Sequence, residues 1–337
     1  MFSAALWPLS LLAAVNAQYS ATYLPSNVPP TTEEGQVGTN QCGTALNQTS
    51  ECQNAYMNSL DDWCLWAPPS PGAGSAIGET ERIEVAWCIK NGTGARLIPD
   101  GAITGAHWIQ TPDFIQITGT GDMTLLNIPI DDQGGELDPH GADGNGNPIG
   151  GLVFSTAFGK LEQVFEWTNF MGTGQFCFRA CNPAGHNAPG FCQHIYDTLG
   201  CPWNMPGNYQ NGSFDSCKAD SGEPMGVYGA STFHQGDAST PAAHPAPATS
   251  SCTTLSTIGN GFIVHGTSIV ASTASATPSS SKAVSSGSTS RSSGAPAPTN
   301  SNSAGISTAG SVQGWERLVM SVGSAVVLSM VGALVVL

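Results

Sequence analysis

Ten cysteines constrain the folding of this chain more than any other feature of its sequence. Four lie before residue 90 and six lie after residue 176. An even number of cysteines in an oxidising compartment indicates disulfide bonds, and pairing within each group is the simplest expectation. The spacing C-x3-C-x10-C-x-H, from Cys177 to His194, also resembles a zinc knuckle. Disulfides are favoured over zinc because the N-terminal segment, described next, predicts a secreted protein. The ten are Cys42, Cys52, Cys64, Cys88, Cys177, Cys181, Cys192, Cys201, Cys217 and Cys252.

The N-terminal segment predicts that the chain enters the secretory pathway. Apolar residues fill the positions up to Val15, and Val15-Asn16-Ala17 places small residues where a signal peptidase cleaves. Pro8 interrupts the run, which argues against a buried helix. We therefore expect residues 1–17 to be a signal peptide that is removed before Gln18.

The C-terminal segment predicts a lipid anchor. Residues 318–337 carry no charge and are long enough to span a bilayer, but no Lys or Arg follows them. Small residues, a polar spacer and an apolar tail form the pattern of a GPI attachment signal, here over residues 314–337. Asn302 or Ser303 is the expected attachment residue, with Ser307 as a further choice. A tail-anchored membrane protein is the alternative, and the signal peptide argues against it.

The composition changes near residue 238. Residues 238–313 consist mainly of Ser, Thr, Ala, Gly and Pro, which predicts a disordered, O-glycosylated stalk. Residues 18–237 contain 23 of the 24 acidic residues, all but Glu316, and six of the nine basic ones. We expect one acidic globular domain there, and its charge argues against nucleic-acid binding. Three N-glycosylation acceptors predict a sugar-coated surface: Asn47, Asn91 and Asn211.

The periodicity of apolar residues predicts a mainly β domain, with α+β as the alternative. Alternation at Ile83, Val85, Trp87 and Ile89 predicts one strand, and further candidate strands are marked by Phe114, Ile117, Leu125, Ile128 and Phe176. Helical spacing predicts helices over residues 50–66 and 191–200. Turns rich in Gly and Pro favour a disulfide-rich β-sandwich or an irregular barrel with short helices.

The loop GELDPHGADGNGNPIGG, residues 135–151, leaves two interpretations open. Asp143, Asn145 and Asn147 have the spacing of the first oxygen ligands in a calcium loop, and Asp138 or Glu136 would add charge. The Gly and Glu that complete an EF-hand are replaced by Pro148 and Phe154. A tight turn shaped by Asp, Asn and Gly is favoured over a structural calcium site made by Asp138, Asp143, Asn145 and Asn147. We expect no other cofactor.

The sequence contains no motif of a known catalytic site. It has no G-x-S-x-G elbow, no H-E-x-x-H helix and no phosphate-binding loop, and the expected pairing of all ten cysteines argues against a cysteine nucleophile. A glycan-active enzyme that uses carboxylates near Glu162, Glu166 or Asp138 is the alternative to a protein without catalysis. Tryptophans suit the stacking of sugar rings, and we select three candidates for a glycan site: Trp66, Trp108 and Trp203.

Four strings resemble a family of secreted fungal GPI-anchored glycoproteins that carry the label "macrophage-activating glycoprotein". The strings are DDWCLWAPP, GGELDPHGADGNGNPIGGLVF, CQHIYDTLGCPWNMPGNY and PMGVYGASTF. The resemblance covers roughly residues 41–244, and the stalk and the apolar tail are similar in kind. It implies a fungal cell surface or wall and, from the label, an effect on host immune cells. It implies no reaction and no catalytic residues.

These observations together predict a non-enzymatic protein of the cell surface or cell wall. Its role would be structural, adhesive or weakly glycan-binding, with wall polysaccharide or surface glycans as partners. The GPI lipid would attach it to the outer face of the plasma membrane.

Overall fold

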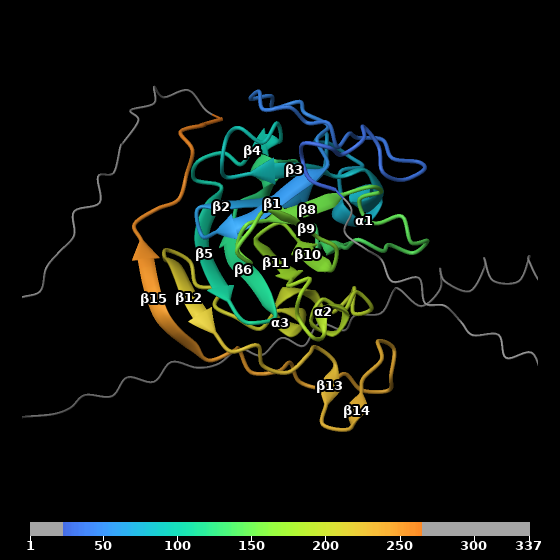
Figure 1. Cartoon of the computed structure of the whole chain (residues 1–337), viewed down its shortest axis with the longest axis vertical. Helices are drawn as coiled ribbons and strands as arrows, with labels where there is room; N and C mark the ends of the chain where they lie inside the picture. The colour runs from blue at the N-terminus through green and yellow to red at the C-terminus, as the bar shows by residue number, and fades with distance from the viewer. Residues whose placement is uncertain (1–22, 265–337) are drawn as a thin grey trace, which may run out of the picture. The chain divides into compact units, whose positions relative to one another are not determined.

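Two β-sheets build most of the part of the protein that the structure, a computed structural model, describes, namely residues 23–264 (Figure 1). The first sheet has six strands in the order β4-β3-β2-β1-β8-β9. The pairs β3–β4 and β1–β8 are parallel, and the other pairs are antiparallel. The strands are β1 (Asn54–Ser59), β2 (Asp62–Ala67), β3 (Val85–Cys88), β4 (Arg96–Leu97), β8 (Leu152–Ser155) and β9 (Glu162–Val164).

The second sheet has seven strands in the order β15-β12-β5-β6-β11-β10-β7. Only the pair β12–β5 is parallel. The strands are β5 (Ile103–Gln110), β6 (Phe114–Gly121), β7 (Gly135–Leu137), β10 (Trp167–Met171), β11 (Gln175–Cys181), β12 (Phe214–Ala219) and β15 (Thr249–Leu255). A small hairpin adds β13 (Val227–Tyr228) and β14 (Ser231–Thr232). The expected mainly β, disulfide-rich fold is confirmed.

The helices are all short and lie in the connections between strands. They are the α-helices α1 (Ile77–Thr80), α2 (Ala188–Phe191) and α3 (Gly200–Asn204) and the 3₁₀-helices η1 (Glu81–Ile83) and η2 (Met123–Leu126). Within residues 23–264, none is both long enough and apolar enough to cross a membrane. The predicted signal peptide and the GPI signal lie outside these residues.

The core lies between the two sheets and is rich in aromatic side chains. Trp63 of β2 stacks on Phe176 of β11, with ring centroids 5.1 Å apart. Trp66 of the same strand meets Trp167 of β10 at 5.7 Å. Such pairs contribute about 0.5–1.5 kcal/mol each beyond the burial of their area. Aromatic contacts between β2 and the strands β10 and β11 therefore join the sheets into one sandwich.

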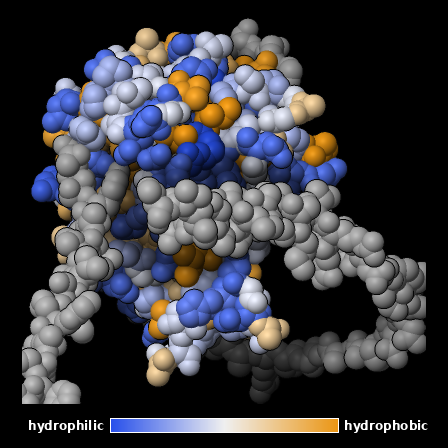
Figure 2. Space-filling model, turned by 90° about the vertical axis from the view of Figure 1, so that its right-hand side faces the viewer, coloured by the Kyte–Doolittle hydropathy of each residue, from blue (hydrophilic) through white to orange (hydrophobic). Residues whose placement is uncertain are grey.

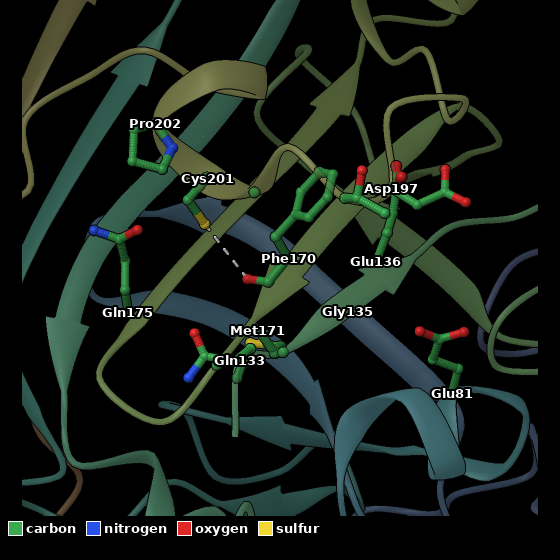
Figure 3. A pocket seen from close by; sticks show the side chains of 14 residues that line it. Glu81, Gln133, Gly135, Glu136, Phe170, Met171, Gln175, Asp197, Cys201 and Pro202 are labelled. Carbon is green, nitrogen blue, oxygen red and sulfur yellow. Dashed lines mark hydrogen bonds between the residues drawn. The ribbon is translucent and has the colours of Figure 1, made fainter. Parts of the chain in front are cut away.

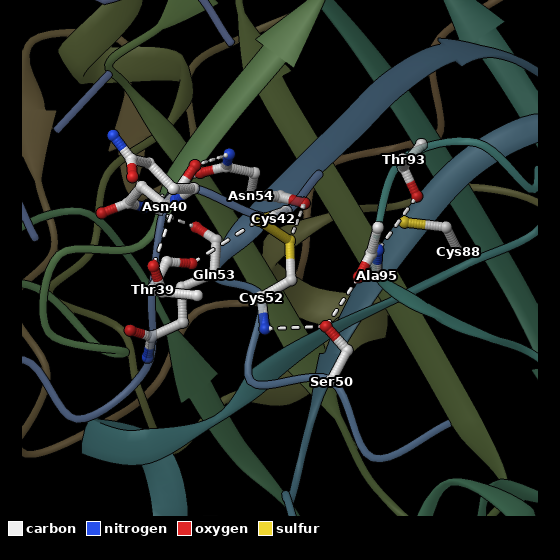
Figure 4. The surroundings of a disulfide bond; sticks show 12 residues. Thr39, Asn40, Cys42, Ser50, Cys52, Gln53, Asn54, Cys88, Thr93 and Ala95 are labelled. Carbon is white, nitrogen blue, oxygen red and sulfur yellow. Dashed lines mark hydrogen bonds between the residues drawn. A yellow bond between two sulfur atoms is a disulfide. The ribbon is translucent and has the colours of Figure 1, made fainter. Parts of the chain in front are cut away.

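All ten cysteines form disulfides, and the expected pairing within each group is confirmed. The bonds are Cys42–Cys52, Cys64–Cys88, Cys177–Cys201, Cys181–Cys192 and Cys217–Cys252. Around the first of them, the segment before β1 is held by a buried amide (Figure 4). The Asn40 side chain donates to the carbonyl oxygens of Gln53 and Gly150 at 3.1 and 3.0 Å. This segment therefore belongs to the folded unit.

Both predicted helices are wrong. Residues 50–66 form the hairpin of β1 and β2, with a turn at Leu60 and Asp61. Because both faces of β2 are buried, its apolar residues do not alternate, and their spacing imitates a helix. Residues 191–200 are mostly turns between α2 and α3, because disulfides at Cys192 and Cys201 hold both ends of the segment to β11.

The strand predictions are correct in part. Val85 and Trp87 lie in β3, Phe114 and Ile117 in β6, and Phe176 in β11. Four other predicted residues lie outside the strands: Ile83 in η1, Leu125 in η2, and Ile89 and Ile128 in connections. The folded unit also continues beyond residue 237, where we expected the stalk to begin. β15 and the bond of Cys252 to Cys217 belong to the second sheet.

Removing the disulfide Cys64–Cys88 should destabilise the sandwich. The two residues are register partners on β2 and β3, and each is 1% exposed. We expect the double substitution Cys64→Ala, Cys88→Ala to lower the free energy of unfolding by about 2–4 kcal/mol, measured by urea denaturation followed by tryptophan fluorescence. The matched double substitution of Cys217 and Cys252, which releases the exposed edge strand β15, should cost less. Equal losses would contradict this ranking.

Candidate functional site

A cavity of about 470 Å³ opens beside β7, at one edge of the second sheet (Figure 3). Its walls come from η1, β7, β10, β11 and the residues that precede and begin α3. Three carboxyl side chains line it, those of Glu81, Glu136 and Asp197, and none of its lining residues is Lys, Arg or His. The cavity is therefore acidic and has no basic group on its walls.

Glu136 reaches the cavity because of strand alternation. Its neighbour Leu137 is 0% exposed in the core between the sheets, so Glu136 points to the opposite face of β7. Phe170 of β10 is its register partner and lines the same cavity. Gly134 has φ = +90°, and a Cβ there would overlap the carbonyl oxygen of Met171. Glycine at this position lets β7 approach β10 closely.

The segment that supplies Asp197 is held on this face by two disulfides of β11. Cys177 and Cys181 are four residues apart on β11, so both point to the outer face, and they bind Cys201 and Cys192. Between these two points of attachment the chain carries His194 and Asp197. Figure 3 shows the Asp197 carboxyl group next to that of Glu136.

Burial and neighbouring carboxyl groups raise the pKa of two glutamates of the cavity, Glu81 and Glu136. Burial raises the pKa of Glu136 well above its usual value, and the charges of Asp138 and Asp197 add to this effect. Burial together with the charges of Asp197 and Asp138 raises the pKa of Glu81 to about 7. Both effects have one cause: each anion has lost water without gaining a cation.

A pair of histidines lies next to the cavity. The rings of His140 and His194 are stacked, with centroids 4.1 Å apart. Nε2 of His140 lies 3.1 Å from Glu166 Oε2, and Nδ1 of His194 lies 3.7 Å from Asp138 Oδ1. The hydrogen bond to Glu166 raises the pKa of His140, whereas burial and the neighbouring His140 lower the pKa of His194. The two rings therefore differ in proton affinity.

The loop 135–151 has the hydrogen bonds of a tight turn. Asp138 and Asn147 form an antiparallel bridge, and Asp138 Oδ1 accepts from the backbone N–H groups of His140 and Gly141 at 2.8 and 2.7 Å. Asp143 binds Arg82 through both oxygens, at 2.9 and 2.7 Å. Asp143 Oδ1 also accepts a hydrogen bond from the backbone N–H of Asn145 at 3.1 Å.

The predicted calcium ligands therefore have separate partners. The Asn147 side chain donates to Glu81 Oε2 at 3.2 Å. Among residues 23–264, no group of three or more His, Cys, Asp or Glu side chains is arranged to hold a metal ion. We find no calcium site in this loop.

The other predicted site residues are distributed over the molecule. Trp66 and Trp108 are 0% and 3% exposed in the core, so the expectation that they stack on sugars is wrong for both. Trp203 is partly buried, and its indole N–H donates to the Pro241 carbonyl oxygen at 2.9 Å. Asn47, Asn91 and Asn211 are exposed, as an attached glycan requires. Asn302 and Ser303 lie outside the described residues.

The carboxylates of the predicted enzyme alternative do not form one site. Glu162 lies 3.7 Å from Lys160, and Glu166 binds His140. Asp138 is close to the cavity but caps its own turn.

Sequence reasoning missed Glu81 and Asp197, which belong to no motif. The only available signal was the disulfide framework, since Asp197 lies between Cys192 and Cys201.

Replacing Glu81 should stabilise the protein at neutral and higher pH. A carboxyl group whose pKa rises from 4.5 to about 7 on folding contributes stability below pH 4.5 that is lost as the pH rises through 7. We expect Glu81→Gln to raise the melting temperature at pH 8 by about 2–4 °C, allowing for screening of this partly exposed group, and to leave it unchanged at pH 4. The exposed neighbour Glu79, changed to Gln, is the control and should shift neither value. A loss of stability at pH 8 would contradict the effect.

Two curated fungal proteins are similar to this chain, both from Mycosarcoma maydis. Appressorium protein ROW1 is 52% identical over 240 residues, which is 70% of this chain and 55% of ROW1. Appressorium protein ROW2 is 48% identical over 248 residues, which is 72% of this chain and 85% of ROW2. The chain thus spans little more than half the length of ROW1. No protein-family profile matches it, and no solved structure does.

These relatives confirm the fungal kinship expected from the sequence. Neither of their names supports the macrophage-activating label. The disulfide-rich fold and the fungal relatives are consistent with an extracellular or cell-surface location. The extent of identity shows that the chain belongs to the family of fungal proteins that includes ROW1 and ROW2.

Proposed function

We propose that this protein is a GPI-anchored glycoprotein of the fungal cell surface, with a structural or adhesive role in contacts with wall glycans and without catalysis. The observation that carries this proposal is the pairing of all ten cysteines in five disulfides within one β-sandwich. Disulfides of this density form in the secretory pathway and persist outside the cell. The names of the two relatives suggest the appressorium as the place where such a surface protein acts.

The surface of the folded unit supports a role outside the cell. The three N-glycosylation acceptors lie at exposed positions, on the loops before β1, before β4 and before β12. Figure 2 shows hydrophilic residues over most of one face, with hydrophobic residues in small groups between them. None of the three residues lines the acidic cavity, so glycans would be attached outside it.

The cavity beside β7 supports glycan binding better than the predicted tryptophans do. Its polar groups include the carboxyl groups of Glu81 and Asp197 and the amide of Gln175, which suit hydroxyl groups. Phe170 and Pro202 add apolar surface for the C–H faces of a sugar ring. Its size is within the usual range of ligand sites, about 300–1,000 Å³.

Enzymatic release should test the location and the anchor together. An epitope tag inserted in the exposed loop at Gly72 and Gly74 should be detected on intact fungal cells. A phospholipase specific for phosphatidylinositol should then release the tagged protein into the medium. A variant that lacks residues 314–337 should be secreted without any phospholipase. Retention of the full-length protein inside the cell, or on membranes after treatment, would refute the anchored location.

A second candidate function is hydrolysis of a glycosidic bond in the same cavity. The observation that favours it is the pair of carboxyl groups, Glu136 and Asp197, which lie side by side with Glu81 across the cavity (Figure 3). Burial raises the pKa of Glu136 well above its usual value, as a general acid requires. No tryptophan lines the cavity, however, so it lacks a broad aromatic surface on which a sugar ring could stack.

Reducing-end assays separate the two functions. If the protein is a hydrolase, the secreted full-length chain should release new reducing ends from β-1,3-glucan or chitin. Asp197→Asn should then lower the rate by about 10²–10⁴-fold, the usual contribution of a general acid or base. Glu79→Gln, which removes a charge outside the cavity, should retain the rate. Absence of release by the unaltered protein would eliminate hydrolysis of these glycans and leave the binding function.

A further inference from the structure

One oxygen of a buried glutamate faces the cavity without a hydrogen-bond donor. Glu136 is 4% exposed, and its Oε1 accepts from the Thr168 hydroxyl at 2.6 Å. No N–H or hydroxyl group among residues 23–264 donates to its Oε2, whose neighbour is the Asp197 carboxyl group. A buried carboxylate oxygen without a donor costs free energy, and folded proteins rarely keep one without a purpose. This oxygen is an independent sign that something binds in the cavity.

The charges around this oxygen define the ligand it would accept. Asp197 lies beside Glu136, and Glu81 faces them from η1 (Figure 3). The histidines nearby are already engaged, since His140 binds Glu166 and His194 lies against Asp138. Arg82 is held by Asp143. Three carboxyl groups therefore line a cavity whose walls include no Lys, Arg or His, and their negative charge disfavours phosphates and uronic acids as ligands.

We propose that the cavity binds the ammonium group of an amino sugar, as found in oligomers of β-1,4-linked glucosamine. This inference deepens the proposed glycan-binding function and rests on it. An ammonium group brings N–H donors and a positive charge, which match the free oxygen of Glu136 and the adjacent carboxyl group of Asp197, while Glu81 on the opposite side of the cavity adds negative charge. An ammonium group bound there compensates the negative charge of the cavity, which otherwise contributes to the raised pKa of Glu81 and Glu136.

The remaining walls favour a sugar over another organic cation. The Gln175 amide lies on β11 at the edge of the cavity, where it is placed to bind hydroxyl groups. Phe170 and Pro202 offer apolar surface for ring C–H groups. A polyamine has neither hydroxyl groups nor a ring to use these contacts. The acidic balance of the folded unit, 23 acidic against six basic residues, attracts a polycationic chain from a distance.

Two oligosaccharides that differ mainly in charge test the proposal. The secreted full-length chain should be titrated calorimetrically with glucosamine hexamer and with N-acetylglucosamine hexamer at pH 6. We expect the N-acetylated form to bind at least about tenfold more weakly, because it lacks the charge-assisted hydrogen bonds. Raising NaCl from 50 to 500 mM should weaken only the binding of the glucosamine hexamer.

Three variants locate the site. Asp197→Asn and Glu81→Gln keep the shapes of the side chains, and each should weaken glucosamine binding about tenfold or more. Glu79→Gln is the matched control: it removes one charge two residues from Glu81, outside the cavity, and should bind like the unaltered chain. Unchanged melting profiles at pH 6, or a gain in stability for Glu81→Gln, would show that each variant folds.

The other outcomes overturn the inference. Equal affinity for both hexamers would show that charge does not select the ligand, and no binding of either would show that the cavity is not a glucosamine site. Spermidine binding as tightly as the glucosamine hexamer would identify a general cation site instead of a sugar site. An equal loss of glucosamine binding in Glu79→Gln would show that the overall charge of the protein, and not the cavity, causes the weaker binding. None of these results would alter the test of surface location, so failure here is distinguishable from failure of the proposed surface function.

Discussion

Two disulfides from a single strand hold the structure around the cavity together. Cys177 and Cys181 of β11 bind Cys201 and Cys192, and the segment between these partners crosses the outer face of the second sheet. Without these bonds, turns with so little regular structure would have few interactions to keep them on the sheet. They place Asp197 beside Glu136 and His194 beside His140. The acidic cavity is thus a product of covalent attachment as much as of β-sheet pairing.

Arg179 of the same strand is a buried cation whose hydrogen bonds go to uncharged partners. Arg179 lies between Cys177 and Cys181 on the same face of β11, and it donates to Gln116 Oε1 and to the Phe191 carbonyl oxygen. Its guanidinium carbon lies 4.2 Å from the centre of the Phe114 ring. Burial lowers its pKa to about 9. Its charge is used to fasten α2 to the sheet, and the carboxyl groups of the cavity remain without a basic partner.

Sequence reasoning succeeded where the relevant pattern was local or compositional, and failed where it depended on contacts across the fold. The even count and the grouping of cysteines were enough to predict pairing within each group. The helix expected over residues 50–66 failed because Trp63, Cys64 and Leu65 are buried on both faces of β2, which removes the alternation that identifies a strand. The stalk boundary failed at β15, since every residue of that strand is exposed and its composition matches a linker. Nothing near Glu81 or Asp197 in the sequence indicates that they meet, because 116 positions separate them and only the fold brings them together.

The loop 135–151 resembles a metal-binding loop in sequence, but its polar side chains form a turn and bind η1. Its acidic and amide side chains satisfy the backbone of the turn or reach outward to η1, where Asp143 binds Arg82 and Asn147 binds Glu81. The exposed ion pair adds little stability by itself, although Arg82 lowers the pKa of Asp143 to about 2. The backbone bridge between Asp138 and Asn147 does more, because it fixes where β7 ends. The loop therefore acts as a frame that holds Glu81 and Glu136 on opposite sides of one cavity. Calcium chelation would require the side chains of Asp143 and Asn147 to point toward one ion inside the loop. The loop would then lose its contacts with Arg82 and Glu81 of η1.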